Sequence, residues 1–327
     1  MMKLSLIVAA ACVHVPAVLA AEVVGVGNFS HIVADLERSI EFYGGVLELE
    51  PNLAPTSFSD NPAIMRLGNT PGAQSRIATF RIQGSELGVE LIEYKDIERE
   101  PVQTRFQHPG ASVLQLRVRD LDVVLERLAD SAGQIWTPTG EPITLGGNTR
   151  IIFIQDPDGF FVELIEVAKG ADGTVPPPSN VVGGTFELII ADTDENARFY
   201  RAGAAFDPQV SASFDDTKLL TDTVDTPGAR FRRTVLTIPG TSVTMAFLEF
   251  QGIYRKPLTT RVQDPGTAIL QLFVDDVPAM TTQLAAAGGT VISSGGAPVD
   301  LGEGRLLSIV RDPNNLFLEL IPRRAAR

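Results

Sequence analysis

The sequence ADLERSIEFY at residues 34–43 returns as ADTDENARFY at residues 191–200, with an offset of 157 residues. Four more stretches return in the same order at nearly the same offset, namely TPGA (70–73 and 226–229), TRFQHPG and TRVQDPG (104–110 and 260–266), DPDG and DPNN (156–159 and 312–315), and VELIE and LELIP (162–166 and 318–322). Repeated matches at one period indicate an internal duplication. They predict two tandem domains, at residues 22–168 and 181–323.

Residues 169–180, with the sequence KGADGTVPPPSN, separate the two copies. A segment this rich in Gly and Pro is typical of a linker, and three consecutive prolines favour an extended chain. Residues 324–327 are expected to form a frayed tail.

Strands and helices alternate within each copy. Apolar alternation in the first copy predicts strands at 23–33, 76–82, 87–94, 112–118, 151–155 and 160–166. Asp35 and Asp120 are placed to cap helices at 36–46 and 121–132. Because the order strand–helix–strands occurs twice per copy, we expect an α+β fold with a mostly antiparallel sheet.

Composition excludes several classes of function. The 327 residues carry a formal charge of −13, which disfavours binding to the nucleic-acid backbone. One cysteine excludes an intramolecular disulfide, and with only three histidines the chain can supply few imidazole ligands to a metal.

The N-terminus is similar to a secretory signal peptide. A short basic start, an apolar run at 4–19 and small residues around Ala20 and Ala21 predict a signal segment at 1–21. A membrane anchor and a lipoprotein signal ending at Cys12 are the alternatives. We therefore expect a periplasmic or secreted protein with no membrane span after cleavage.

Three stretches carry a family resemblance: HIVADLERSIEFYGGVLELE (31–50), LQLRVRDLD (114–122) and IQDPDGFFVELIE (154–166). They resemble the vicinal oxygen chelate superfamily, which includes glyoxalase I, bleomycin resistance proteins and extradiol dioxygenases. The resemblance implies paired βαβββ units that curl around a cleft, with two such units in each tandem domain. The chain would then carry four units.

In metal-using members of this superfamily, the resemblance implies four ligand positions in each domain. These positions fall on Asn28, Glu90, Val113 and Glu163 in the first copy and on Thr185, Ala246, Ile269 and Glu319 in the second. Neither set contains a histidine, and both include aliphatic residues, so too few donors remain for a transition metal. We expect no cofactor; if a divalent metal is bound, its ligands would be Asn28, Glu90 and Glu163.

Carboxylates and glutamines are the candidate functional groups. Glu90 and Glu163 are the candidate catalytic residues, because a desolvated cleft carboxylate gains basicity; an ion pair with arginine is the alternative for Glu163. Gln115 and Gln271 recur on the presumed cleft face, where they would bind ligand or a neighbouring strand. The candidate ligand-binding residues are Asn28, Val113, Gln115, Phe161, Thr185, Ile269, Gln271 and Glu319.

The histidines are assigned structural positions. His31 lies on the strand face opposite residues 28, 30 and 32, so we expect it to pack against the helix. His108 precedes Pro109 and is expected in a surface loop.

Two functions fit these residues. The first is an exported protein that binds a small apolar or aromatic molecule without the usual metal. The second is a glyoxalase-type lyase or isomerase, or an extradiol-type dioxygenase, with a reduced metal site in the first domain. The chain is expected to be a monomer or a homodimer.

Overall fold

The computed structural model describes residues 20–170, 175–176 and 178–323. The predicted signal segment up to residue 19, part of the predicted linker and the predicted tail lie outside the described residues. No helix in the described ranges is both long and apolar enough to cross a bilayer.

Four βαβββ units follow one another along the chain. Unit 1 contains β1 (Val23–Val33), α1 (Leu36–Ile40) with a π-helical turn (Glu41–Val46), β2 (Glu50–Leu53), α2 (Pro62–Gly68), β3 (Gln74–Arg81) and β4 (Gly88–Lys95). Unit 2 contains β5 (Ser112–Val118), α3 (Leu121–Ala129), β6 (Gln134–Ile135), β7 (Ile143–Thr144), a 3-10 turn (Gly146–Asn148), β8 (Arg150–Gln155) and β9 (Phe161–Glu166). Unit 3 contains β10 (Val181–Ile190), α4 (Thr193–Ala204), β11 (Gln209–Val210), α5 (Lys218–Thr223), β12 (Arg230–Thr237) and β13 (Thr244–Gln251). Unit 4 contains β14 (Ala268–Val274), α6 (Val277–Ala286), β15 (Thr290–Val291), β16 (Val299–Asp300), β17 (Leu306–Arg311) and β18 (Phe317–Pro322).

The predicted helix caps are confirmed. The side chain of Asp35 accepts a hydrogen bond from the backbone N–H of Arg38, and Asp120 caps α3 in the same way. The first helix widens into a π-helical turn after Ile40, where the N–H of Leu47 donates to the carbonyl of Phe42. The predicted helix at 121–132 ends earlier, at Ala129.

Strand pairing arranges the strands of the described residues into two nine-stranded sheets. Sheet A has the order β15-β17-β18-β14-β1-β4-β3-β2, with β16 paired to β17. Sheet B has the order β11-β12-β13-β10-β5-β9-β8-β6, with β7 paired to β8. Most neighbouring strands are antiparallel, so the predicted α+β class with paired βαβββ units is confirmed.

The sheets do not follow the two sequence copies. Unit 1 pairs with unit 4 through β1 and β14, and unit 2 pairs with unit 3 through β5 and β10. Our expectation that the two units of one copy enclose a cleft together is therefore wrong. The ranges 22–168 and 181–323 mark the sequence repeats, whereas each sheet takes one unit from each repeat.

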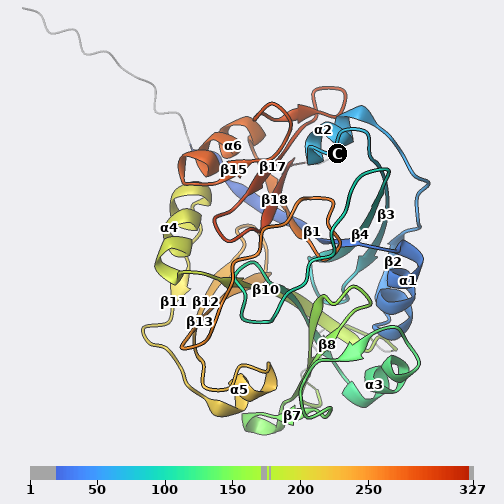
Figure 1. Cartoon of the computed structure of the whole chain (residues 1–327), viewed down its shortest axis with the longest axis vertical. Helices are drawn as coiled ribbons and strands as arrows, with labels where there is room; N and C mark the ends of the chain where they lie inside the picture. The colour runs from blue at the N-terminus through green and yellow to red at the C-terminus, as the bar shows by residue number, and fades with distance from the viewer. Residues whose placement is uncertain (1–19, 171–174, 177, 324–327) are drawn as a thin grey trace, which may run out of the picture.

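Helix packing joins the units in a different combination. Unit 1 meets unit 2 where Phe42 packs over Gly133, and α4 packs on α6 of unit 4 at Gly203. A Cβ atom at Gly203 would lie 2.9 Å from Leu284 Cδ2, so a larger residue there would have to displace the Leu284 side chain. Figure 1 shows α4 beside α6 on one side of the molecule and α1 near α3 on the other. Strands thus connect the two repeats, and helices connect units within each repeat.

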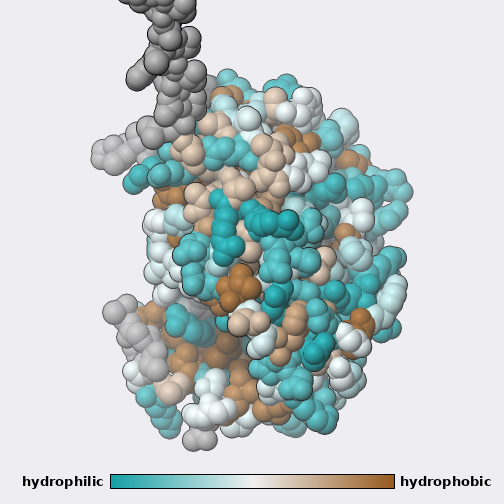
Figure 2. Space-filling model, turned by 90° about the vertical axis from the view of Figure 1, so that its left-hand side faces the viewer, coloured by the Kyte–Doolittle hydropathy of each residue, from teal (hydrophilic) through white to brown (hydrophobic). Residues whose placement is uncertain are grey.

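Apolar residues from all four units form one continuous core. Two smaller clusters lie on the sheets, one on sheet A with Tyr94 and Phe317, and one on sheet B with Phe106 and Phe161. The face that carries α4 and α6 is largely hydrophilic, with hydrophobic atoms gathered toward its lower end (Figure 2). Residues of each smaller cluster line a cavity on their own sheet.

Candidate functional site

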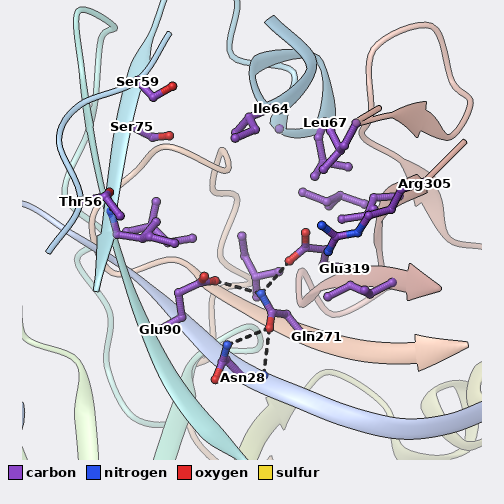
Figure 3. Close-up of a pocket in the computed structure, with 18 of the residues that line it drawn as sticks. Asn28, Thr56, Ser59, Ile64, Leu67, Ser75, Glu90, Gln271, Arg305 and Glu319 are labelled. Carbon is purple, nitrogen blue, oxygen red and sulfur yellow. Dashed lines mark hydrogen bonds between the residues drawn. The ribbon is translucent and has the colours of Figure 1, made fainter. Parts of the chain in front are cut away.

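A cavity of about 780 Å³, here called the sheet A cavity, lies between units 1 and 4. Alternate residues of β4, namely Glu90, Ile92 and Tyr94, point into it. Helix α2 covers one side with Ile64 and Leu67 (Figure 3). Its lining is mainly apolar, with Thr56, Ser59 and Ser75 on one wall and a cluster of hydrogen-bonded polar groups at the base (Figure 3). A mainly apolar lining with a few polar groups is the usual composition of a small-molecule site.

Gln271 of β14 joins two carboxyl groups at this base. Its Nε2 donates hydrogen bonds to Oε2 of Glu90 and Oε2 of Glu319, each at 2.9 Å (Figure 3). Glu90 and Gln271 are each 8% exposed. The hydroxyl of Ser30 also donates to Glu90, at 2.6 Å. Four strands, β1, β4, β14 and β18, therefore bring polar side chains together at this base.

Asn28 fixes the orientation of the Gln271 amide. The backbone N–H and the side-chain Nδ2 of Asn28 both donate to Oε1 of Gln271 at 3.0 Å. The pairing of β1 with β14 is irregular between Val26 and Phe29, which leaves the N–H of Asn28 to the side chain. Because Oε1 faces two donors, the NH₂ group of Gln271 faces the carboxyl groups.

Burial raises the pKa values of both carboxyl groups. Desolvation raises the pKa of Glu90, although the hydrogen bond from Ser30 opposes this shift. Desolvation and the nearby charge of Glu90 raise the pKa of Glu319 to about 7, against the hydrogen bond from Gln271 and the charge of Arg305. The pair therefore holds a proton to higher pH than a solvent-exposed glutamate does.

These residues do not fit a divalent cation in this arrangement. Carboxylate and amide oxygens would suit a hard cation, but Nε2 of Gln271 occupies the space between Glu90 and Glu319. Turning the amide to offer its oxygen would place its NH₂ group against the backbone N–H of Asn28. Two donors would then face each other, and one would lose its acceptor.

Sheet B carries a related cluster beside a smaller cavity of about 220 Å³, the sheet B cavity. Nε2 of Gln115 donates to Glu163 at 2.6 Å, and Glu187 forms an ion pair with Arg233 at 2.8 Å. Desolvation, followed by the charge of Glu187, raises the pKa of Glu163 to about 8.

The candidate ligand-binding residues are distributed over both sheets. Asn28, Ile269, Gln271 and Glu319 line the sheet A cavity, and Gln115 lines the sheet B cavity. Thr185 lines a further cavity beside Gln115. Val113 and Phe161 are buried in the sheet B cluster, at 0% and 1% exposure, behind the cavity lining.

The two candidate catalytic carboxylates lie in different cavities. Glu90 is in the sheet A cavity and Glu163 in the sheet B cavity. Asn28, Glu90 and Glu163 were predicted to be the ligands of a divalent metal, if one is bound. This prediction is therefore wrong. Unit 4, and not unit 2, completes the cluster around Glu90, because β1 pairs with β14.

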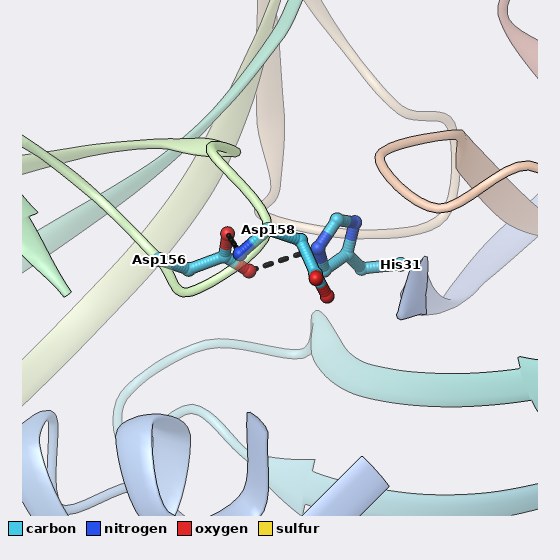
Figure 4. A group of neighbouring side chains, drawn as sticks. All are labelled: His31, Asp156 and Asp158. Atoms are coloured by element: carbon cyan, nitrogen blue, oxygen red, sulfur yellow. Dashed lines mark hydrogen bonds and ion pairs between the residues drawn. The ribbon is translucent and has the colours of Figure 1, made fainter. Parts of the chain in front are cut away.

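His31 packs in the interior, as predicted. It is fully buried, and its Nε2 lies 2.9 Å from Oδ2 of Asp156 (Figure 4). His31, Asp156 and Asp158 place one ligand atom each within 4.8 Å of one another, as a cation site would require. The carboxylate oxygens of Asp156 and Asp158 already accept hydrogen bonds from Tyr43, from Arg38 and from backbone N–H groups.

The second repeat indicates that this cluster is structural. Asp312 accepts the same bonds, from the hydroxyl of Tyr200 and from two backbone N–H groups, with Leu188 and Asn314 in place of His31 and Asp158. His108 lies elsewhere and is only 9% exposed, so our expectation of a surface histidine is wrong. The N–H of Arg105 donates to its Nδ1, which holds the ring inside the loop.

Two residues that contact the carboxyl pair of the sheet A cavity, Ser30 behind Glu90 and Arg305 beside Glu319, were missed by sequence reasoning. Ser30 shares the strand face of Asn28, and that alternation could have identified it. Arg305 follows a turn in which Gly302, Glu303 and Gly304 all have positive φ, and no sequence pattern predicts its direction. Its guanidinium lies at the cavity beside Glu319, and no described carboxylate forms an ion pair with it (Figure 3).

Comparison with known proteins gives one family. Residues 25–164 match the Glyoxalase/Bleomycin resistance protein/Dioxygenase superfamily. The lactoylglutathione lyase of Salmonella typhimurium is 27% identical over 143 residues, which cover 43% of this chain and 91% of that protein.

Two solved structures have the same fold over nearly the whole chain. Glyoxalase I from Zea mays is 17% identical, with a TM-score of 0.59 over 93% of this chain and 92% of the maize chain. A putative dioxygenase from Bacillus subtilis is 14% identical, with a TM-score of 0.56 over 94% of this chain and 87% of that chain.

Proposed function

Because residues 25–164 belong to the Glyoxalase/Bleomycin resistance protein/Dioxygenase superfamily, a part of the vicinal oxygen chelate superfamily, we propose that the sheet A cavity binds a small, mainly apolar molecule without a divalent metal. One observation carries this proposal. The Gln271 amide, oriented by Asn28, joins Glu90 and Glu319 at the base of the cavity. An amide hydrogen-bond donor thus takes the place between the carboxyl groups where a cation would be expected.

The cavity suggests how the ligand is recognised. A volume of about 780 Å³ suits a molecule of drug size, and the apolar walls favour an aliphatic or aromatic body. The carboxyl pair at the base accepts a hydrogen bond when ionised and can donate one when protonated, and burial favours the protonated form. A ligand with a hydroxyl or carbonyl group at one end fits this base.

Elemental analysis combined with native mass spectrometry tests the proposal. We expect purified protein to carry less than one equivalent of metal and to retain a co-purified small molecule after chelation. Ile64→Trp, on α2, should block the cavity and remove that molecule. Leu220→Trp is the matched control, because Leu220 holds the equivalent repeat position beside the sheet B cavity. Stoichiometric metal that is required for retention of the small molecule would contradict the proposal.

Proton transfer is a second candidate function. The relatives in the comparison are lactoylglutathione lyases, and Glu319 has a pKa of about 7, which suits a general base. The carboxylate would take a proton from a hydroxyl-bearing carbon beside a carbonyl and return it to the carbonyl carbon, while the hydroxyl proton passes to the former carbonyl oxygen. Lactoylglutathione lyase activity in chelator-treated protein, lost in Glu319→Gln, would support this candidate. Activity that appears only with added metal would instead indicate a metal site.

We also propose that the chain is exported and works as a monomer. The basic, apolar and small-residue pattern at 1–21 supports export, which N-terminal sequencing after cell fractionation tests. Both sheets are completed within one chain, which supports a monomer. Light scattering after size-exclusion chromatography would measure the assembly.

A further inference from the structure

We propose that the sheet B cavity is a second, separate binding site, selective for a compact, uncharged aromatic molecule. It shares no lining residue with the sheet A cavity, and it lies on the sheet formed by units 2 and 3. This proposal does not depend on the ligand of the sheet A cavity.

Each cavity contains two carboxyl groups, but one of the two lies at a different repeat position in sheet A and in sheet B. In sheet A the pair is Glu90 and Glu319, with Ser30 beside Glu90. In sheet B the repeat equivalents of Ser30 and Glu90 are Glu187 and Ala246. The carboxyl group has therefore moved from the fourth strand of the unit to the first, where it meets Glu163.

One carboxylate of the sheet B pair forms a direct ion pair with arginine, whereas the sheet A carboxyl groups have, among the described residues, only the nearby charge of Arg305. Arg233 of β12 forms an ion pair with Glu187 at 2.8 Å, and its repeat equivalent in sheet A is Ile77. Gln115 donates to Glu163, which is only 8% exposed. Burial, together with the nearby charge of Glu187, raises the pKa of Glu163 to about 8 and so favours its neutral form. The cavity thus presents no net charge and offers one carboxyl O–H to a ligand.

Aromatic side chains make this cavity small. Phe231, Phe153 and Phe106 line it, whereas the equivalent positions near the sheet A cavity are Ser75, Ile309 and Val262. The larger side chains reduce the space on sheet B, where the cavity has about 220 Å³ against about 780 Å³ on sheet A. A protein cavity of about 150 Å³ is sufficient for benzene, so a single substituted ring fits. Edge-to-face contacts with the phenylalanine rings favour an aromatic ligand.

The only tryptophan of the chain can report on this site. Trp136 packs edge-to-face on Phe161, with 5.2 Å between ring centroids, and Phe161 packs on Phe106 of the cavity wall. We would titrate the full protein with benzyl alcohol and follow the tryptophan fluorescence. We expect a saturable change, with binding that weakens about tenfold or more for benzoate and for benzylamine. Tighter binding of either charged probe, or no saturable change, would overturn the proposal.

Variants locate the bound probe. Val224→Phe fills the sheet B cavity and should weaken benzyl alcohol binding about tenfold or more. Leu220→Phe provides a second test at a half-buried helix position, where added volume is better tolerated. Ile64→Phe, the repeat equivalent of Leu220→Phe, should leave the fluorescence titration unchanged. A titration altered by Ile64→Phe and not by Leu220→Phe would place the probe in the sheet A cavity and refute a separate site.

Discussion

The side-chain nitrogen of Gln271 lies 2.9 Å from a carboxyl oxygen of Glu90, although 181 residues separate them in sequence. The same nitrogen donates to Glu319. This contact exists because β1 pairs with β14, so the site in the sheet A cavity belongs to the first and last units together. The amide supplies two N–H donors to two buried acceptors, which neither carboxyl group could provide for the other when ionised.

Replacing Gln271 by glutamate should convert this base into a cation site. Three carboxyl groups would then converge, while Asn28 still donates to one oxygen of residue 271. Without a cation, mutual repulsion should lower the free energy of unfolding by about 1–3 kcal/mol. Mn²⁺ or Ca²⁺ should restore part of that loss, because oxygen donors suit these ions. Urea unfolding with and without each ion measures both effects.

Gln271→Leu is the control for this prediction. It removes the same amide from Glu90 and Glu319 without adding a charge, so it should be destabilised but gain nothing from Mn²⁺. An equal response of Gln271→Glu and Gln271→Leu to the ion would show that the cation binds elsewhere.

Glu319→Gln should make the stability of the protein less dependent on pH. The pKa of Glu319 is raised from 4.5 to about 7, so the folded protein holds this proton more tightly than the unfolded chain does. Its contribution to stability is therefore greatest below about pH 4.5 and decreases as the pH rises toward about 7. Glutamine cannot ionise, and its oxygen can still accept from Gln271. Urea unfolding across this range should show a smaller decline for the variant.

Arg305→Gln tests the same assignment from the opposite direction. The charge of Arg305 lowers the pKa of Glu319, so its removal should raise that pKa further. The decline of stability should then extend to higher pH than in the unmodified protein. An unchanged profile in both Arg305→Gln and Glu319→Gln would mean that Glu319 is not the titrating group.

The repeated positions could be identified from the sequence, because duplication preserved them. Gln115 and Gln271, and likewise Glu163 and Glu319, lie at equivalent positions and all line cavities. The strand face of Asn28, the burial of His31 and the helix caps followed from alternation and side-chain chemistry. These are local properties, which a single unit already determines.

The partner of each unit could not be predicted in the same way. β5 and β14 are both apolar strands of seven residues, so the strand pattern alone does not decide which of them pairs with β1. Sequence order favoured the neighbouring unit, and this assumption put Glu90 with Glu163 instead of Glu319. The direction of Arg305 was also unpredictable, because it depends on three consecutive positive φ angles in the preceding turn.

Cutting the linker should leave the two repeats associated. β1–β14 and β5–β10 hold strands of different repeats in register, and the core includes residues from all four units. A protease site inserted at 171–174 should therefore yield two fragments that elute together at the mass of the intact chain. We expect a single unfolding transition for the cut protein. Fragments that separate and unfold independently would show that each repeat is a self-contained domain.

His31→Leu should destabilise the protein in a manner that depends on pH. Burial alone lowers the pKa of His31, but the charge and hydrogen bond of Asp156 more than offset this effect, and the net pKa is raised above 6.5. Protonated His31 therefore stabilises the folded state below about pH 6.5, and this contribution is lost as the pH rises through the raised value. We expect a loss of about 1–3 kcal/mol in acidic buffer and a smaller loss in alkaline buffer, measured by urea unfolding.

The second repeat supplies the control for this variant. His31→Leu combined with Asp158→Asn reproduces the residues found at Leu188 and Asn314, where Asp312 is held by Tyr200 and backbone N–H groups alone. Removing the charge of Asp158 should recover part of the stability, since this carboxylate no longer lies near a cationic imidazole. A loss for His31→Leu that is the same at every pH would contradict a charged His31, and would leave cavity formation as its cause.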